Sequence, residues 1–372
     1  MEFWRIRKLF LAVFCLAQLI GHAQTTTVTI MGTVTDEVTG ELLPFANVYI
    51  NNSSIGTTTN EKGAYTLANL PIGNIDVAVS YLGYAPIKQT LRFEQPGLKK
   101  VLFKMRQGVE LEGVVIFSKK SKKREQRLKI ITRELLGAGR FSKLCKLLNP
   151  EVLRISLDDN GHLTAQTISP LKIENRALGY LIHQDLSDFD FYEGKVYYGG
   201  NTRFELLKPA NEEEENRWRA NQKTAYQGSL KQLLTSMVSD SLRENGFRVF
   251  QEIPDSLRMF SRVSTQNGMS FIKNHLHNRI EEVRGRALIR PGELETERLV
   301  VSGTKLEVFN LNKRSSSPYS DMSYAYSVIS FPQGYSVISP QGWLIMPNGI
   351  DIRGDLGNDR FANLLPADWK RD

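Results

Sequence analysis

A series of short alternating apolar and polar runs, from residue 27 to about residue 106, restricts the fold of this chain more than any other feature. Turn residues separate the runs at 36–40, 60–63 and 71–73, where glycine or asparagine can adopt a positive φ and proline fixes a negative one. Turn signals about 8 to 12 residues apart are typical of an all-β sandwich or barrel. We therefore predict a small β-sandwich with strands at 28–35, 46–50, 64–67, 75–81 and 100–104.

Six separated motifs in this region occur in the order of a known domain. They are GTVTD at 32–36, GELLPFANV at 40–48, GTTTN at 56–60, GAYTL at 63–67, LPIG at 70–73 and SYLGY at 80–84. Together they resemble the carboxypeptidase regulatory-like domain over residues 28–106. The resemblance implies a seven-stranded transthyretin-like β-sandwich that serves as a non-catalytic accessory domain.

The resemblance also implies where such a domain occurs. It follows zinc carboxypeptidases, and in Bacteroidota-type bacteria it forms the N-terminal extension of TonB-dependent outer-membrane receptors. Residues 108–117 are similar to the segment that follows the domain in those receptors. The 255 residues after Phe117 are too few for the receptor's plug and barrel, so its transport activity is not carried over.

Polar and aromatic side chains of this domain have structural interpretations. Asp36, Asn47 and Asn60 lie where side-chain oxygens can close turns onto backbone amides, and a ligand or calcium role is the alternative. Three tyrosines suit half-buried strand positions, although a sugar-stacking patch is the other possibility. These are Tyr65, Tyr81 and Tyr84.

The remainder of the chain is predicted to be a β-rich α+β region, which makes the protein mainly β with some α. Helical spacing of leucine and isoleucine predicts a helix over 128–136, and a second apolar run continues through Phe141, Leu144 and Leu148 until Asn149-Pro150. Strands are expected at 153–157, 162–168, 178–186, 189–192 and 195–198, with hairpin turns at 158–161 and 193–194.

Further along the chain, an acidic run at 212–215 indicates a solvated loop or a helix start. Ser229 and Gln232 form a capping box for a helix whose apolar face runs to Leu242, with Gly246 as its stop. A hairpin is predicted around Gly303-Thr304, between strands at 298–302 and 305–310. The sequence YSVIS occurs at 326–330 and again at 335–339, each time followed by Pro-Gln-Gly, which suggests successive strands with equivalent turns. Segments 225–250, 342–349 and 364–366 resemble uncharacterised exported Bacteroidota proteins.

The N-terminus has the pattern of a secretory signal peptide. Arg5, Arg7 and Lys8 precede an apolar run at 9–20, and small residues follow it before Gln24. The predicted divisions are therefore a signal peptide at 1–23, the sandwich at 28–106, a linker with a basic cluster at 107–127, and a β-rich α+β domain of unknown function at 128–372. Cleavage would leave Cys145 as the only cysteine, so no internal disulfide is expected, and its apolar helical run places it in a core.

The net charge of +8 is local rather than general. Outside the signal peptide and residues 119–129, the chain has 38 basic and 38 acidic side chains. A solvated linker is one interpretation of the basic cluster, and contact with anionic lipid headgroups or lipopolysaccharide is the other. No aromatic side chains are interleaved with these bases, which argues against nucleic acid as a partner. The cluster includes Lys119, Lys120, Lys122, Lys123 and Arg124.

A search for catalytic chemistry finds no complete motif. None of the histidines at 162, 183, 275 and 277 has the glutamate three positions on that a zinc carboxypeptidase needs. His275 and His277 would share one face of an extended segment and are weak metal-ligand candidates without an evident third ligand. The Ser270 and Lys273 spacing matches penicillin-binding enzymes, but the accompanying Lys-Thr-Gly is missing. No catalytic residue and no cofactor are predicted.

These observations favour a non-catalytic cell-envelope protein, exported to the periplasm or associated with the outer membrane, that uses β-sandwich surfaces to contact proteins or glycans. Two alternatives stay open. One is a hydrolase or peptidase whose site is assembled from residues 150–372, and the other is an accessory to TonB-dependent nutrient uptake through an outer-membrane receptor.

Overall fold

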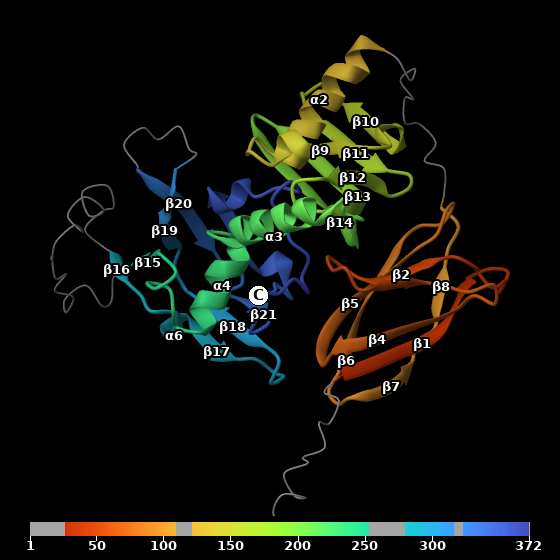
Figure 1. Cartoon of the computed structure of the whole chain (residues 1–372), viewed down its shortest axis with the longest axis horizontal. Helices are drawn as coiled ribbons and strands as arrows, with labels where there is room; N and C mark the ends of the chain where they lie inside the picture. Colours follow the sequence, from red (N-terminus) through yellow and green to blue (C-terminus); the bar gives the residue numbers. More distant parts are fainter. Residues whose placement is uncertain (1–26, 109–120, 253–279, 316–322, 372) are drawn as a thin grey trace, which may run out of the picture.

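The structure is a computed structural model that describes residues 27–108, 121–252, 280–315 and 323–371. Three hydrophobic cores succeed one another along the chain, the first within residues 28–105, the second within 131–204 and the third within 233–356. The second core also takes in Phe361 and Ala362 from the C-terminal segment. The protein is mainly β with some α, as the sequence predicted (Figure 1).

Two four-stranded sheets form the N-terminal sandwich, which confirms the predicted β-sandwich. The first sheet contains β1 (Thr27–Asp36), β4 (Ala64–Pro71), β7 (Gly97–Lys100) and β8 (Phe103–Met105). The second contains β2 (Asn47–Ile50), β3 (Gly56–Thr58), β5 (Gly73–Ser80) and β6 (Ile87–Phe93). Alternate residues of β1, including Val28, Ile30 and Val34, are fully buried between the sheets, as a half-buried strand requires.

The sandwich has eight strands where seven were expected, because one strand position is divided. β7 and β8 both pair in parallel with β1, along successive parts of its length. Between them the carbonyl oxygen of Val101 lies 1.7 Å from the point where a Cβ of Gly32 would stand. The chain can approach β1 this closely only because residue 32 has no side chain, and the ladder is interrupted there.

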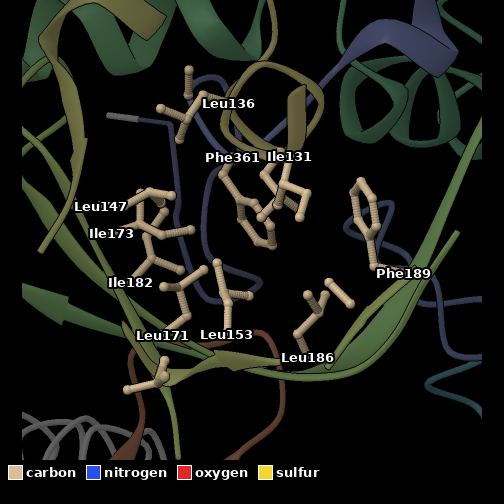
Figure 2. Packing of buried hydrophobic residues seen from close by; sticks show 14 of the residues in the cluster. Ile131, Leu136, Leu147, Leu153, Leu171, Ile173, Ile182, Leu186, Phe189 and Phe361 are labelled. Atoms are coloured by element: carbon tan, nitrogen blue, oxygen red, sulfur yellow. The ribbon is translucent and has the colours of Figure 1, made fainter. Parts of the chain in front are cut away.

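The second part is a curved six-stranded antiparallel sheet around helix α2 (Lys122–Leu136). The Ser121 side chain caps the helix by accepting from the Arg124 amide, and Gly137, at φ +79°, ends it. Ile131 and Leu136 of α2 face the concave side of the sheet together with Phe361 (Figure 2). The strands are β9 (Cys145–Leu147), β10 (Leu153–Leu157), β11 (Leu163–Thr167), β12 (Leu171–Asn175), β13 (Tyr180–Tyr192) and β14 (Lys195–Leu206).

One local prediction in this part was wrong. The apolar run after Gly139 does not form a second helix; it forms a 3₁₀ turn (Ser142–Leu144) followed by β9. Cys145 therefore lies on an edge strand paired with β12, where it is partly buried, because strand pairing overrides the helical spacing. Helix α2 begins at Lys122, so the last residues of the expected linker at 107–127 belong to this helix.

The third part contains helices α3 (Glu212–Tyr226) and α4 (Leu230–Val238), a short helix α6 (Gly285–Leu288) and two sheets. The predicted acidic start of α3 and the Ser229 cap of α4 are both confirmed, but α4 ends at Val238 rather than at the predicted stop Gly246. One sheet has β15 (Phe247–Glu252), β16 (Ile280–Glu282), β19 (Leu306–Arg314), β20 (Tyr324–Ser330) and β22 (Asp351–Gly354). The other has β17 (Ile289–Pro291), β18 (Arg298–Val301) and β21 (Tyr335–Ile338). No helix within the described ranges has both the length and the apolar composition for a membrane span.

The predicted hairpin at Gly303-Thr304 was wrong, because its two strands belong to different sheets. β18 pairs with β17 and β21, whereas β19 pairs with β15 and β20. The YSVIS repeats are also divided between β20 and β21. Their turns are equivalent as predicted, since Gly334 and Gly342 both have positive φ and both donate to the carbonyl three residues earlier.

Candidate interaction surface

One end of the sandwich is fixed to the second part of the chain by backbone hydrogen bonds. In the loop between β2 and β3, the Asn52 amide donates to the Thr202 carbonyl at 2.6 Å, and the Ser53 carbonyl accepts from the Phe204 amide at 2.9 Å. The Asn51 side chain accepts from the Thr202 amide at 2.8 Å. The loop therefore extends the sheet edge at β14, and we call this set of contacts the docked end.

A buried acid lies beneath this loop. The Tyr49 hydroxyl donates to Asp185 at 2.8 Å, and both side chains are almost completely buried. Burial disfavours the charged carboxylate and raises the pKa of Asp185 to about 6, although the Tyr49 hydrogen bond and the charge of Arg203 act in the opposite direction. Burial also raises the pKa of Tyr49, so its hydroxyl keeps its proton and remains the donor.

The C-terminal segment completes the docked end. Asp368 accepts from the Ser54 amide at 2.8 Å and also from its hydroxyl, and the Ala367 amide donates to the Asn52 carbonyl at 2.9 Å. The Lys231 amine donates to the carbonyls of Ala367 at 3.0 Å and Trp369 at 2.7 Å. Burial lowers the pKa of Lys231 to about 8. Three stretches that are distant in sequence thus meet at one point.

The third part of the chain contacts the same end of the sandwich. The Asn74 side chain donates to Glu297 at 2.6 Å, and Arg92 pairs with Glu293 at 2.7 Å. Asn74 begins β5 and Arg92 ends β6, so both lie at the same end of the second sheet as the β2–β3 loop. In Figure 1 this end faces the centre of the molecule, where the C-terminus also lies.

The opposite end of the sandwich exposes large apolar side chains. The register pair Asn47 and Ser80 marks this end of the second sheet, and the exposed residues Phe45 and Leu82 each lie two positions beyond the pair. Contiguous exposed apolar residues at one site usually mark an interaction surface. We call this set the apolar end: Val38 is 85% exposed, Leu42 48%, Phe45 66% and Leu82 81%.

Phe45 is the most unusual residue of the apolar end. Its φ of +61° is in the left-handed region, which a bulky side chain seldom adopts. The conformation is held by the Phe45 amide donating to the Thr59 carbonyl at 3.0 Å, while the Thr59 hydroxyl bonds the chain on both sides of Phe45. A strained aromatic side chain that is turned to solvent contributes little to the core, and such strain is typical of functional positions.

Hydrogen bonds hold the neighbouring loops in place. Asp36 accepts from the Val38 and Thr39 amides at 2.7 and 2.8 Å and from the Tyr84 hydroxyl at 2.7 Å. The hydrogen bond from the Thr39 amide is the largest of the effects that lower the pKa of Asp36 to about 2. The turn role predicted for Asp36 is thus observed, and Asn60 has the same role by accepting from two amides.

The other polar and aromatic candidates of the sandwich lie in a strand or pack against neighbouring residues. Asn47 lies within β2 rather than in a turn. Tyr65 is buried and donates to the Val101 carbonyl at 2.8 Å, while the rings of Tyr81 and Tyr84 pack against each other with centroids 5.3 Å apart. Tyr65 therefore cannot belong to a sugar-stacking patch on this domain.

The structure describes only some of the candidate catalytic and metal-ligating residues. His275, His277, Ser270 and Lys273 lie outside the described residues. His183 contacts Glu205 at 2.9 Å, and burial lowers the pKa of its ring to about 4. Within the described ranges, no three histidine, cysteine or acidic side chains lie close enough to hold a metal ion.

The basic cluster is only partly described. Lys119 and Lys120 lie outside the described residues, and Lys122 and Lys123 are exposed in the first turn of α2. Arg124 is engaged within the fold, since its guanidinium donates to the carbonyls of Pro150 and Leu153 at 3.1 Å each. Arg124 therefore has a structural role in joining α2 to the start of β10.

The sequence of the sandwich matches a known family model at residues 30–116. This segment is a CarboxypepD_reg-like domain. The match confirms the resemblance found in the motifs and covers less than a quarter of the chain. No curated protein matches the chain.

Solved structures are only distantly similar. The major pilin subunit BcpA of Bacillus cereus has 16% identity and a TM-score of 0.18, covering 22% of this chain and 31% of its own, so this chain spans about a third of the pilin. A candidate carbohydrate-binding protein of Bacteroides uniformis has 10% identity and a TM-score of 0.19; the match covers 48% of this chain and 99% of that protein. A candidate membrane-associated protein of unknown function from Bacteroides fragilis has 12% identity and a TM-score of 0.17; the match covers 88% of this chain and 96% of that protein. TM-scores this low transfer neither fold nor function.

The sequence did not reveal the apolar end. Val38 lies within a turn, Phe45 follows a proline and Leu82 precedes a glycine, so each resembles an ordinary loop residue. Their common signal is a large apolar residue in a segment rich in turn residues. Only the strand register shows that these loops meet at the same end of the sandwich.

Proposed function

We propose that this chain is a non-catalytic cell-envelope protein whose CarboxypepD_reg-like domain binds a partner protein through the apolar end. The observation that carries the proposal is the contrast between the two ends of one sandwich. The docked end is buried by the rest of the chain, and the apolar end presents Val38, Phe45 and Leu82 to solvent. The signal-peptide pattern at 1–23 supports an exported location.

The surroundings of the apolar end favour a protein over a lipid surface. Glu37, which pairs with Arg106 at 2.7 Å, lies beside exposed Glu41, and Glu61 and Lys62 occupy the neighbouring turn. A mixed-charge rim around an apolar centre is the usual composition of a protein interface. Anionic headgroups would be repelled by the acidic members of this rim.

Site-specific photo-crosslinking in the native host tests the proposal. A photoreactive amino acid at position 82 should crosslink a defined envelope protein that mass spectrometry identifies. The same group at position 98 provides a matched control, because Leu98 is 60% exposed on β7, outside the apolar end. We expect the crosslink at position 82 and none at position 98.

Affinity measurements with the purified partner give the second readout. Because hot-spot residues dominate interfaces, Leu82→Ser combined with Val38→Ser should weaken binding about tenfold or more, while Leu98→Ser leaves it unchanged. Equal effects at both sites would contradict the proposal. Crosslinking of position 82 to lipid alone would also overturn it, in favour of a membrane surface.

A further inference from the structure

The outer face of the β13–β14 hairpin carries a second group of exposed side chains, outside the sandwich. The hairpin turns at Glu193 and Gly194, which both have positive φ, as predicted for its two-residue turn. Leu163 and Phe189 point from this sheet into the core around α2. The residues that alternate with them, among them Asp190, point to the opposite face.

A stacked aromatic pair lies on this outer face. The rings of His162 and Tyr192 are parallel within 3°, and their centroids are 4.1 Å apart. His162 Nδ1 lies 3.1 Å from Asp190, and the backbone amide of His162 donates to Asp158 at 2.8 Å. The contacts at the ring and the backbone fix the orientation of the pair, which is partly exposed.

Tyr197 extends this surface on the neighbouring strand. It pairs directly with Asp190 across the hairpin, and it is 62% exposed. Its hydroxyl lies 3.5 Å from the point where a Cβ of Gly199 would stand, so the ring runs along the strand over a residue without a side chain. Tyr197 and Tyr192 are diagonal neighbours across the ladder, a separation of about 7–8 Å between backbones.

We propose that His162, Tyr192 and Tyr197, with Asp190 between them, bind a neutral hexose oligosaccharide. Flat aromatic rings that are exposed on a sheet match the apolar faces of pyranose rings, and a carboxylate beside them accepts hydrogen bonds from sugar hydroxyls. Asp188 pairs with Gly199 in the same ladder, so it supplies a second carboxylate on this face.

Charge and shape select this ligand class. Asp158, Asp159, Asp188, Asp190 and Glu193 outnumber the one lysine at the hairpin tip, Lys195, which pairs with Tyr192, so the local net charge is negative and disfavours phosphate groups and acidic sugars. The same outer face continues to Asp185 and Arg203, where the sandwich covers it, so the site lies next to the docked end.

The proposal can be tested with cellohexaose, mannohexaose and laminarihexaose as probes, using isothermal titration calorimetry on the full chain. We expect saturable binding of at least one of the three. Tyr197→Ala should weaken that binding about tenfold, as truncation of an aromatic anchor does. Tyr324→Ala is the matched control, since Tyr324 is also exposed but lies on β20.

Three outcomes would overturn the proposal. They are no binding of any neutral hexamer to the wild-type chain, equal weakening by Tyr197→Ala and Tyr324→Ala, and equal affinity for an oligogalacturonate of the same length. Leu82→Ser should leave sugar binding intact. Failure of the partner interaction at the apolar end would therefore be distinguishable from failure of the sugar site.

Discussion

The two ends of the N-terminal sandwich differ in how their exposed groups are satisfied. At the docked end, polar groups predominate, and Tyr49, Asn51 and Ser54 find partners on distant parts of the chain. At the apolar end, the backbone is held by local hydrogen bonds and large apolar side chains face solvent. The polar groups of the docked end are paired within this molecule, whereas the side chains of the apolar end stay exposed, as the proposed partner interaction requires.

If the apolar end binds a partner as proposed, stability and binding are separated between the two ends of one domain. Buried polar groups are costly when they lose a partner, so changes at the docked end should act on folding. Exposed apolar groups contribute little to folding, so changes at the apolar end should act on binding. Substitutions at each end therefore test whether the two ends differ in this way.

The largest effect is expected at Tyr49. Tyr49→Phe removes the only hydroxyl donor observed on buried Asp185, and loss of one partner of a buried ionisable group should lower the free energy of unfolding by about 3 kcal/mol. Tyr65→Phe, which removes a buried bond to a neutral carbonyl, should cost about 1 kcal/mol. Urea unfolding measures both changes. Equal losses would show that the hydrogen bond to Asp185 stabilises the fold no more than the bond to a neutral carbonyl.

The next effect concerns pH. The folded-state pKa of Asp185, about 6, exceeds its unfolded value, so protonation favours the folded chain and the charge penalty is fully present above pH 6. Asp185→Asn should stabilise the protein by about 2 kcal/mol at pH 8, and this advantage should fade as pH falls towards 4. Unfolding curves of both proteins across this range test it, and a constant difference would rule out titration of Asp185.

A smaller stabilising effect is expected at Phe45. Asparagine tolerates a positive φ, so Phe45→Asn should relieve backbone strain and raise the free energy of unfolding by about 1 kcal/mol. The same change should weaken the partner interaction. A variant that is less stable than the wild type would mean that the exposed ring supports the fold, contrary to the proposed division.

The smallest effect on stability is expected at Leu82. Leu82→Ser removes a side chain that is 81% exposed, so the free energy of unfolding should change by less than about 0.5 kcal/mol. Thermal unfolding checks this, with Leu98→Ser as the comparison. A large loss at Leu82 alone would indicate hidden packing at the apolar end.

Local patterns predicted much of the secondary structure. The turn at Asp36, the Ser229 cap and the Glu193-Gly194 hairpin depend on contacts within a few residues, and each is found as expected. Predictions failed where a distant partner decides the outcome. Cys145 lies in a strand because β12 pairs with it, and the two strands around Gly303 separate because each finds a different sheet.

The candidate sites follow the same rule. Asn52 and Asp368 look like ordinary polar residues in the sequence. The fold brings Asn52 to Ala367 of the C-terminal segment and brings Asp368 to Ser54. Phe45 and Leu82 are 37 positions apart in the chain, and only the pairing of β2 with β5 places both at one end. The spacing of residues within one segment does not predict contacts between segments that are distant in the sequence.

Alternation and turn chemistry are local properties of the chain, so they were enough to predict the N-terminal β-sandwich, and the motifs along it were enough to predict its CarboxypepD_reg-like character. Tertiary structure alone decided which end of that sandwich is docked and which is exposed. The reason is physical: burial of Asp185 and exposure of Phe45 depend on how separate hydrophobic cores pack together, and no single segment encodes that packing.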